Sequence, residues 1–237
     1  MDADPILYGS RWRRGRNRCA GPIIDQLSCS LDRLRSTTHL LLMLDRGERL
    51  TTETDTQQYE MLRLLDMACG QNEAVSLSCA GFSGESFDQA AIFEIQDEHK
   101  QLPNRTVFGY QHSTSSSGNH AVALEYADHR LSEDGRPGVV LLVSHGMQGR
   151  PDYRTHNLAA DLQAQAPLHL LLHPYQKKDA DEIGAIPTVS AVRRAYADAG
   201  LSSLLDGAPT ENSGLADDYW FQVSLAGAIS DLAARQK

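Results

Sequence analysis

Long apolar runs are absent from this sequence of 237 residues, and its first residues, MDADPILYG, lack the hydrophobic stretch of a signal peptide. No segment approaches the roughly 20 apolar residues that a membrane-spanning helix needs. Cysteine is scarce: Cys19, Cys29, Cys69 and Cys79 are the only four, and no two form a Cys-x-x-Cys pair. We therefore expect a cytoplasmic protein without a membrane contact, in which the thiols are reduced and mostly buried.

Several catalytic motifs are missing as well. The sequence holds neither Gly-x-x-x-x-Gly-Lys-Ser/Thr nor Gly-x-Gly-x-x-Gly, so a nucleotide-binding loop is not indicated. Caspase-like peptidases carry Ser-His-Gly after a strand, as residues 144–146 do here, but their nucleophile is a later cysteine and none follows Cys79. The stretch Gly81–Gly84 lacks the spacing of a Gly-x-Ser-x-Gly elbow. A thiolate or serine nucleophile is therefore disfavoured.

The charge is predominantly acidic, with a net value of −9. General binding of nucleic acid is disfavoured, because phosphate contacts need clustered lysine and arginine. The segment Arg11–Arg18 is the exception, with five arginines around Trp12. We expect a solvated N-terminal arm there, and contact with a polyanion or a protein partner is the alternative.

Strand-like and helix-like patterns alternate along the chain. Short apolar runs favour strands at residues 38–45, 73–82, 90–97, 138–144 and 167–174, and helical spacing favours helices at 55–69, 119–131, 153–165 and 217–237. This alternation predicts an α/β fold with an open, mostly parallel central sheet and helices on both faces, a Rossmann-like three-layer sandwich. Residues 1–37 are expected to form the basic arm and a lead-in helix, and residues 38–237 a single domain.

Three loops should lie at the carboxyl ends of the strands, where open α/β sheets bind their ligands. They are the segments Asp45–Arg49 (DRGER), Ser113–Gly118 (STSSSG) and Ser144–Gly149 (SHGMQG). The order of these elements, between residues 38 and 200, resembles that of a von Willebrand factor A (VWA) domain. In that family three such loops converge on Mg²⁺, and a carboxylate of the partner often completes the metal's shell.

The resemblance is closer in the scaffold than in the site. Asp45 stands at the aspartate of the family's Asp-x-Ser-x-Ser loop, but Gly47 and Arg49 replace its two serines. His145 replaces the aspartate of a Thr-Asp-Gly loop, and Arg49 together with Arg46 brings positive charge to the place of the cation. Fewer oxygen ligands and added guanidinium groups both weaken the binding of a hard cation. The resemblance therefore implies a degenerate metal site in which Asp45 pairs with Arg49 or His145.

We expect no cofactor at this site. A weakly bound Mg²⁺, reached through waters by Asp45, Ser116 or Ser117, is the alternative. Most of the nine histidines are expected to be structural or exposed, because their spacing alone does not show the convergence that a transition metal needs.

A VWA-like scaffold without its metal implies binding rather than catalysis. The expected function is a protein–protein interaction or adaptor module, and some relatives in the family act with an AAA+ ATPase or within a larger assembly. The binding residues would be Asp45, Gly47, Arg49, Ser116, Ser117, His145 and Trp12. The alternative is a hydrolase in which His145 acts as general base and Asp45 orients it, since an ordinary histidine titrates near pH 6.5.

Overall fold

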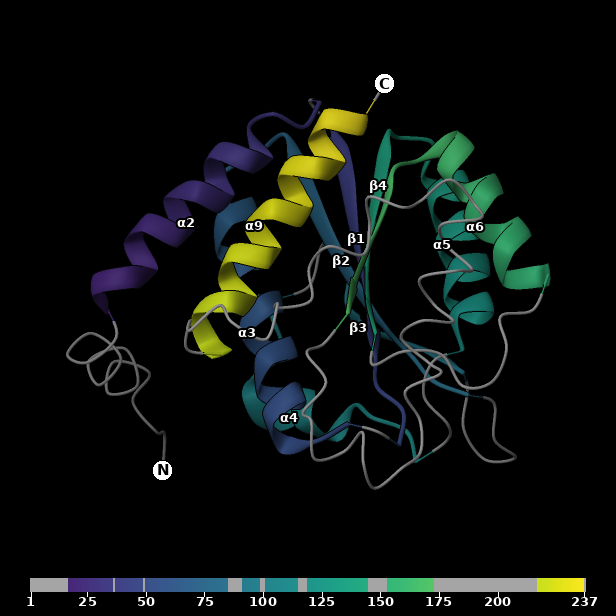
Figure 1. Ribbon diagram of the computed structural model, residues 1–237, viewed down its shortest axis with the longest axis horizontal. Helices are drawn as coiled ribbons and strands as arrows, with labels where there is room; N and C mark the ends of the chain where they lie inside the picture. Colours follow the sequence, from purple (N-terminus) through teal and green to yellow (C-terminus); the bar gives the residue numbers. More distant parts are fainter. Residues whose placement is uncertain are drawn as a thin grey trace.

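A computed structural model describes residues 17–35, 37–48, 50–84, 91–98, 101–114, 119–144, 153–172 and 217–236. Within these ranges strands alternate with helices along most of the chain (Figure 1). The elements are α2 (Asn17–Leu31), β1 (Thr38–Asp45), α3 (Thr52–Cys69), β2 (Val75–Phe82), β3 (Ile92–Gln96), α4 (Arg105–Tyr110), α5 (His120–Asp134), β4 (Gly138–Ser144), α6 (Tyr153–Gln165), β5 (Leu168–Leu172) and α9 (Asp217–Arg235).

The sheet has five strands in the order β3-β2-β1-β4-β5. Strand β1 runs parallel to both of its neighbours, β4 runs parallel to β5, and β3 alone is antiparallel to its partner β2. Every residue of β1 is buried, which accounts for its continuous apolar sequence. The predicted α/β fold with an open, mostly parallel sheet is confirmed.

Helices cover both faces of the sheet (Figure 1). Alternate side chains of β1 point to opposite faces, so Leu40 and Leu42 enter one core and Leu41 and Met43 the other. Helices α2, α3, α4 and α9 contribute buried side chains to the first core, and α5 and α6 to the second. None of the described helices is long and apolar enough to cross a lipid bilayer.

Side-chain caps explain where three helices begin. Thr51 and Thr54 form a capping box at the start of α3, which therefore begins three residues earlier than the sequence pattern indicated. Asn119, one of the two N-cap candidates in the sequence beside Ser117, caps α5 through a bond from the Val122 amide. Asn104 caps the short helix α4 in the same way, and the sequence prediction missed this helix because six residues hold too little periodicity.

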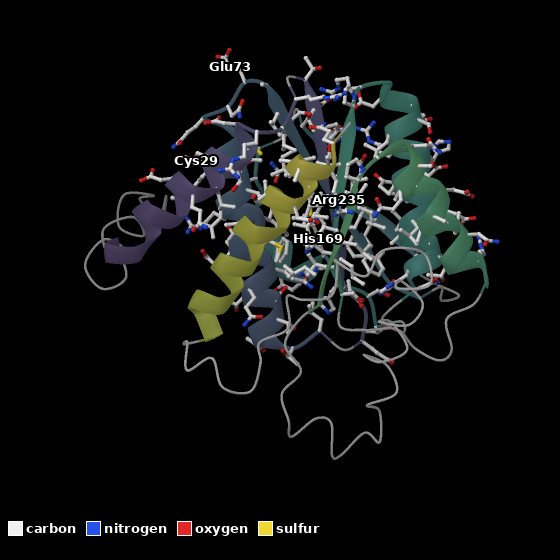
Figure 2. All side chains as sticks on the ribbon, turned by 45° about the horizontal axis from the view of Figure 1, so that its top comes forward. Cys29, Glu73, His169 and Arg235 are labelled. Atoms are coloured by element: carbon white, nitrogen blue, oxygen red, sulfur yellow. The ribbon has the colours of Figure 1, made fainter. Side chains whose placement is uncertain are left out.

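One burial prediction needs correction. In β2 the alternation of Val75, Leu77 and Cys79 predicts a half-buried strand, but Ala80 and Phe82 on its second face are also buried because that core contains α5 and α6. Of the three described thiols, Cys69 and Cys79 are buried and Cys29 is exposed on α2, where Figure 2 labels it, which agrees with the expectation that most are buried. Cys69 fits the prediction, because burial raises the pKa of its thiol to about 12 and keeps it unreactive.

Helix α2 packs on the rest of the fold through Leu27 and Leu31, both fully buried in the core beneath α3 and α9. It begins at Asn17, so the end of the Arg11–Arg18 segment starts this helix. Trp12 and the preceding part of the arm lie outside the described residues. The boundary between residues 37 and 38 stays a prediction.

The histidines with described side chains have structural partners. His169 on β5 bonds Asp231 of α9 at 3.0 Å, and Arg235 contacts the same carboxylate at 2.6 Å (Figure 2). These contacts fix α9 to the edge of the sheet. His112 bonds a backbone carbonyl, and His129 lies exposed beside Glu133, as most histidines were expected to.

A buried histidine network closes the amino-terminal end of the sheet. His39 Nδ1 lies 2.5 Å from Asp134 Oδ2, and His39 Nε2 lies 2.9 Å from Ser78 Oγ. Arg136 bonds Asp134 and Glu98 and holds the pKa of Asp134 below its usual range. The order of groups is that of a serine-hydrolase triad. However, Ser78 is only 5% exposed within a strand, so the network ties α5 to β1 and β2 rather than offering a nucleophile.

This network predicts acid sensitivity. Burial lowers the pKa of His39, although the neighbouring Asp134 acts in the opposite direction. The folded chain therefore holds this imidazole neutral more strongly than the unfolded chain does. Below the unfolded pKa of about 6.5 the unfolded chain binds the extra proton, and stability falls as the pH falls. The loss is about 1.4 kcal/mol for each unit by which folding lowers the pKa. We expect His39→Gln to reduce the fall in unfolding free energy between pH 7 and pH 5, measured with urea.

His129→Gln is the matched control, because the His129 side chain is 75% exposed. Its pH dependence should equal that of the unsubstituted chain. A His39→Gln variant that keeps the full pH dependence would show that His39 is not the group responsible.

Candidate functional site

Two consecutive residues at the carboxyl end of β1 point to opposite faces of the sheet. Asp45 turns toward α5, and Arg46 turns toward α3 and α4. Both side chains belong to fully buried residues, with 0% exposure. A buried carboxylate and a buried guanidinium are stable only if their partners are well placed, so the two sets of contacts define the site.

Asp45 begins a buried hydrogen-bonded chain. Ser144 at the end of β4 donates its hydroxyl to Asp45 Oδ2 in a long contact of 3.4 Å, and His120 Nε2 lies 2.7 Å from the same hydroxyl. His120 is the first residue of α5 and its ring meets that of Phe82 edge-on. The carboxyl ends of β1 and β4 and the amino-terminal end of α5 therefore meet at one point.

The structure describes two of the seven predicted binding residues, Asp45 and Gly47. Gly47 is buried, and its amide donates to Asp45 Oδ1 at 3.4 Å. The others, Trp12, Arg49, Ser116, Ser117 and His145, lie outside the described residues. The predicted pairing of Asp45 with Arg49 or His145, and the alternative of His145 as a general base, both stay predictions.

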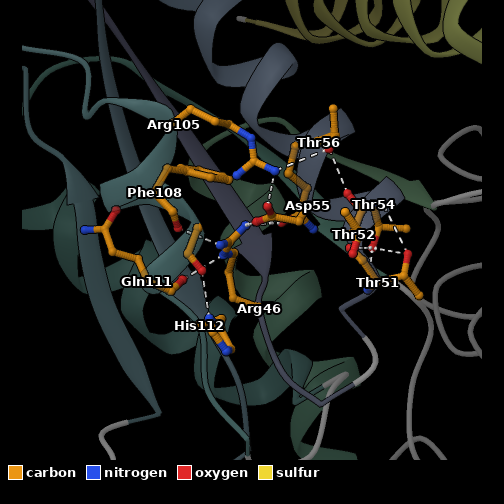
Figure 3. A network of polar contacts seen from close by, with 12 residues as sticks. Arg46, Thr51, Thr52, Thr54, Asp55, Thr56, Arg105, Phe108, Gln111 and His112 are labelled. Carbon is orange, nitrogen blue, oxygen red and sulfur yellow. Dashed lines mark hydrogen bonds and ion pairs between the residues drawn. The ribbon is translucent and has the colours of Figure 1, made fainter. Parts of the chain in front are cut away.

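Arg46 does not occupy a cation position beside Asp45, which corrects the sequence prediction. Its guanidinium points to the other face and donates to the carbonyls of Gln111 and Phe108, each at 2.8 Å (Figure 3). It also donates to Gln58 Oε1 at 3.1 Å and forms an ion pair of 2.8 Å with Asp55. One side chain thus joins the end of β1 to α3, to α4 and to the segment after α4.

The surroundings of Arg46 offset the cost of burying its charge. The guanidinium carbon lies 4.0 Å from the centre of the Phe108 ring, a cation–π contact. Burial lowers the pKa of Arg46, and the carboxylate of Asp55 opposes this shift. Gln58 connects the two faces, because its amide also donates to the Asp45 carbonyl at 2.9 Å.

Asp55 serves two guanidinium groups. It pairs with Arg46 through Oδ1 and with Arg105, at the start of α4, through Oδ2 (Figure 3). Arg105 also contacts Thr56 at 3.3 Å and lies over the ring of Tyr59. The network therefore runs from a fully buried arginine to one whose side chain is 39% exposed.

Gly81 leaves room for this arrangement. A methyl group at Gly81 would lie 2.3 Å from the ring of Phe93 and 3.1 Å from Cγ of Arg46. Contacts below about 3 Å require neighbours to move, so the stem of Arg46 and the Phe93 ring depend on the missing side chain.

The sequence matches no protein-family model and no curated protein sequence. In the part of the chain that the structure describes, histidine, cysteine, aspartate and glutamate form no group of three that could hold a metal ion. The contacts of Asp45 include a glycine amide and a hydroxyl that also contacts an imidazole.

Sequence reasoning missed four residues of the site: His120, Asp55, Gln58 and Arg105. A signal was present for two of them. Asp55 and Gln58 are three apart and fall on the same helical stripe as Leu62, so α3 carries polar groups on its buried side. Such inward polar groups need partners. No comparable sequence signal marked His120 as the neighbour of Ser144.

Removing the Arg46 guanidinium should strongly destabilise the fold. Arg46→Met would leave two carbonyls and the Gln58 carboxamide without their donor, and we expect a loss of about 3–5 kcal/mol in unfolding free energy. The unfolding free energy of Arg46→Lys should lie between those of Arg46→Met and the unsubstituted chain, since an ammonium group keeps the charge but cannot donate as a planar fork. Urea denaturation measures both.

Arg63→Met provides the control for this substitution. Arg63 lies on the outer side of α3 in an ion pair with Glu60, and its loss should change stability by about 0.5 kcal/mol or less. Equal effects of Arg46→Met and Arg63→Met would contradict the role given to the buried guanidinium.

The space at Gly81 provides an independent test. Gly81→Ala should reduce the unfolding free energy by about 1–3 kcal/mol, because the methyl group overlaps the Phe93 ring. Gly227→Ala is the matched control: nothing lies within 4 Å of the added carbon in α9, so stability should rise by about 0.5–1 kcal/mol. A Gly81→Ala variant as stable as the unsubstituted chain would refute the close packing.

Proposed function

We propose that the chain is a protein–protein interaction or adaptor module on a VWA-like scaffold with a degenerate metal site. It would bind its partner at the carboxyl end of the sheet, as a subunit of a larger assembly or as the partner of an AAA+ ATPase. The proposed binding surface consists of the loops Asp45–Arg49, Ser113–Gly118 and Ser144–Asp152, and the structure describes part of each loop.

The Asp45–Ser144–His120 chain is the observation that carries this proposal. It joins the end of β1, the end of β4 and the first residue of α5 through hydrogen bonds, and the VWA resemblance would have a metal ion beside these elements. Hydrogen bonds there would keep the loop ends in place without a cation. A site of this kind would then bind a protein partner through the loops that surround it.

The exposed surface beside the loops suits a protein partner. Glu48 and Thr114 are exposed on two of the loops, and Val107 and Tyr110 on the neighbouring helix α4 are 47% and 77% exposed. Tyrosine is over-represented among residues that dominate binding energy in interfaces.

The test is a partner capture followed by a binding measurement with purified proteins. The intact chain is used as bait, the captured protein is identified and prepared separately, and its affinity is measured by calorimetry. We expect His145→Ala and Asp45→Asn, checked for an unchanged circular dichroism spectrum, to weaken binding by about tenfold or more, which equals about 1.4 kcal/mol.

Glu73→Ala is a suitable control, because Glu73 is exposed between α3 and β2, at the opposite end of the sheet (Figure 2). It should leave the affinity unchanged. A partner that binds all variants equally would place the interaction elsewhere on the chain and contradict the proposed surface.

A further inference from the structure

Met67 is the one methionine in the described ranges with substantial exposure to solvent. It lies near the end of α3 and is 39% exposed, whereas Met43 and Met61 are fully buried, one in each core. The susceptibility of a thioether to oxidation follows its access to the oxidant. Met67 therefore differs from the other two methionines in the property that decides whether oxidation occurs.

The sulfur of Met67 also has a charged donor beside it. Arg63, one helical turn earlier on α3, directs Nη1 to Met67 Sδ at a distance of 3.2 Å. Nε and Nη2 of Arg63 both donate to Glu60 Oε2, at 3.0 and 2.9 Å. These two nitrogens form one edge of the planar guanidinium, so the ion pair with Glu60 orients the group and presents Nη1 to the sulfur.

This contact makes the two lone pairs of the Met67 sulfur unequal. A thioether accepts a hydrogen bond weakly, and the nitrogen at 3.2 Å covers the lone pair on its own side. Oxidation at one lone pair or at the other gives different epimers, because a sulfoxide sulfur is chiral. A small oxidant therefore reaches the lone pair that faces away from Arg63 more readily, and one epimer should predominate.

The reaction is a two-electron oxidation by a hydroperoxide such as H₂O₂. The accessible lone pair of the sulfur forms the new S–O bond while the O–O bond of the peroxide breaks. The hydrogen on the transferred oxygen passes to the departing hydroxide, which leaves as water. The thioether loses two electrons and the peroxide gains them, so no further reactant is needed.

We propose that Met67 is a site of reversible oxidation, at which Arg63 directs a hydroperoxide to one side of the sulfur and so gives one sulfoxide epimer in excess. Reduction then falls mainly to the stereospecific methionine sulfoxide reductase that accepts this epimer. The modification makes an apolar side chain on the outer side of α3 polar, while the methionines of the two cores stay protected. This inference is independent of the proposed partner-binding function.

The experiment treats the folded full chain with H₂O₂ and follows each methionine by mass spectrometry. Cleavage before aspartate releases residues 66–87, a peptide in which Met67 is the only methionine. We expect Met67 to be oxidised about tenfold faster than Met43 or Met61, and the three rates should become similar in urea. Oxidation of Met43 or Met61 as fast as that of Met67 in the folded chain would overturn the assignment of the site.

The epimers are measured on the isolated peptide with the two reductases, each of which reduces one epimer. We expect one epimer to exceed the other by about threefold in the folded chain, because attack on the covered side must displace a weak hydrogen bond. Chain oxidised in urea should give equal amounts, since the contact with Arg63 is lost there. Equal amounts from the folded chain would contradict the proposal.

Two variants test the role of the guanidinium. Arg63→Leu removes the donor, so the two epimers should form equally and the oxidation should be no slower. Arg154→Leu is the matched control, because Arg154 lies on α6 at the opposite face of the sheet (Figure 1), and it should keep the excess of one epimer. Both variants should fold, since each arginine is in a surface ion pair. An Arg63→Leu variant that keeps the excess would show that Arg63 does not direct the oxidation.

Discussion

The buried guanidinium of Arg46 is the contact on which this end of the fold depends. Taking a charge out of water is expensive, and here an ion pair, two carbonyl groups, one carboxamide and an aromatic face replace the lost hydration. These partners come from α3, α4 and the segment behind α4. A single side chain at the end of β1 therefore determines where a six-residue helix lies, although that helix is too short to be stable alone.

The same strand end organises the opposite face by different means. Asp45 points away from Arg46 and reaches Ser144 and, through it, His120, while Gln58 connects the Asp45 backbone to the Arg46 side. The carboxyl end of the sheet is thus held by short-range polar contacts on both faces. The proposed function builds on these contacts, because they hold the ends of β1 and β4 and the start of α5 together.

The sequence predicts the scaffold well, because continuous apolar strands and amphipathic helices have clear periods. Strand β4 and helix α6 lie at the predicted residues. The arrangement of the site was harder to predict from the sequence. Arg46 was assigned to the face of Asp45, since a sequence does not show which way a side chain turns after the strand ends. The contact between His120 and Ser144 joins residues 24 apart and depends on packing between α5 and β4, which local patterns do not encode.

Hydrogen exchange of the Ser113 amide tests most directly whether polar contacts hold this end of the sheet. That amide donates to the Arg46 carbonyl at 2.9 Å, directly beside the two polar networks. Exchange would be followed by NMR on the unsubstituted chain, first with a chelator and then with millimolar Mg²⁺. We expect slow exchange in both conditions with equal protection, since contacts within the chain limit local opening. Fast exchange with the chelator and slow exchange with Mg²⁺ would show that a cation, rather than Arg46 and the Asp45 chain, orders the site.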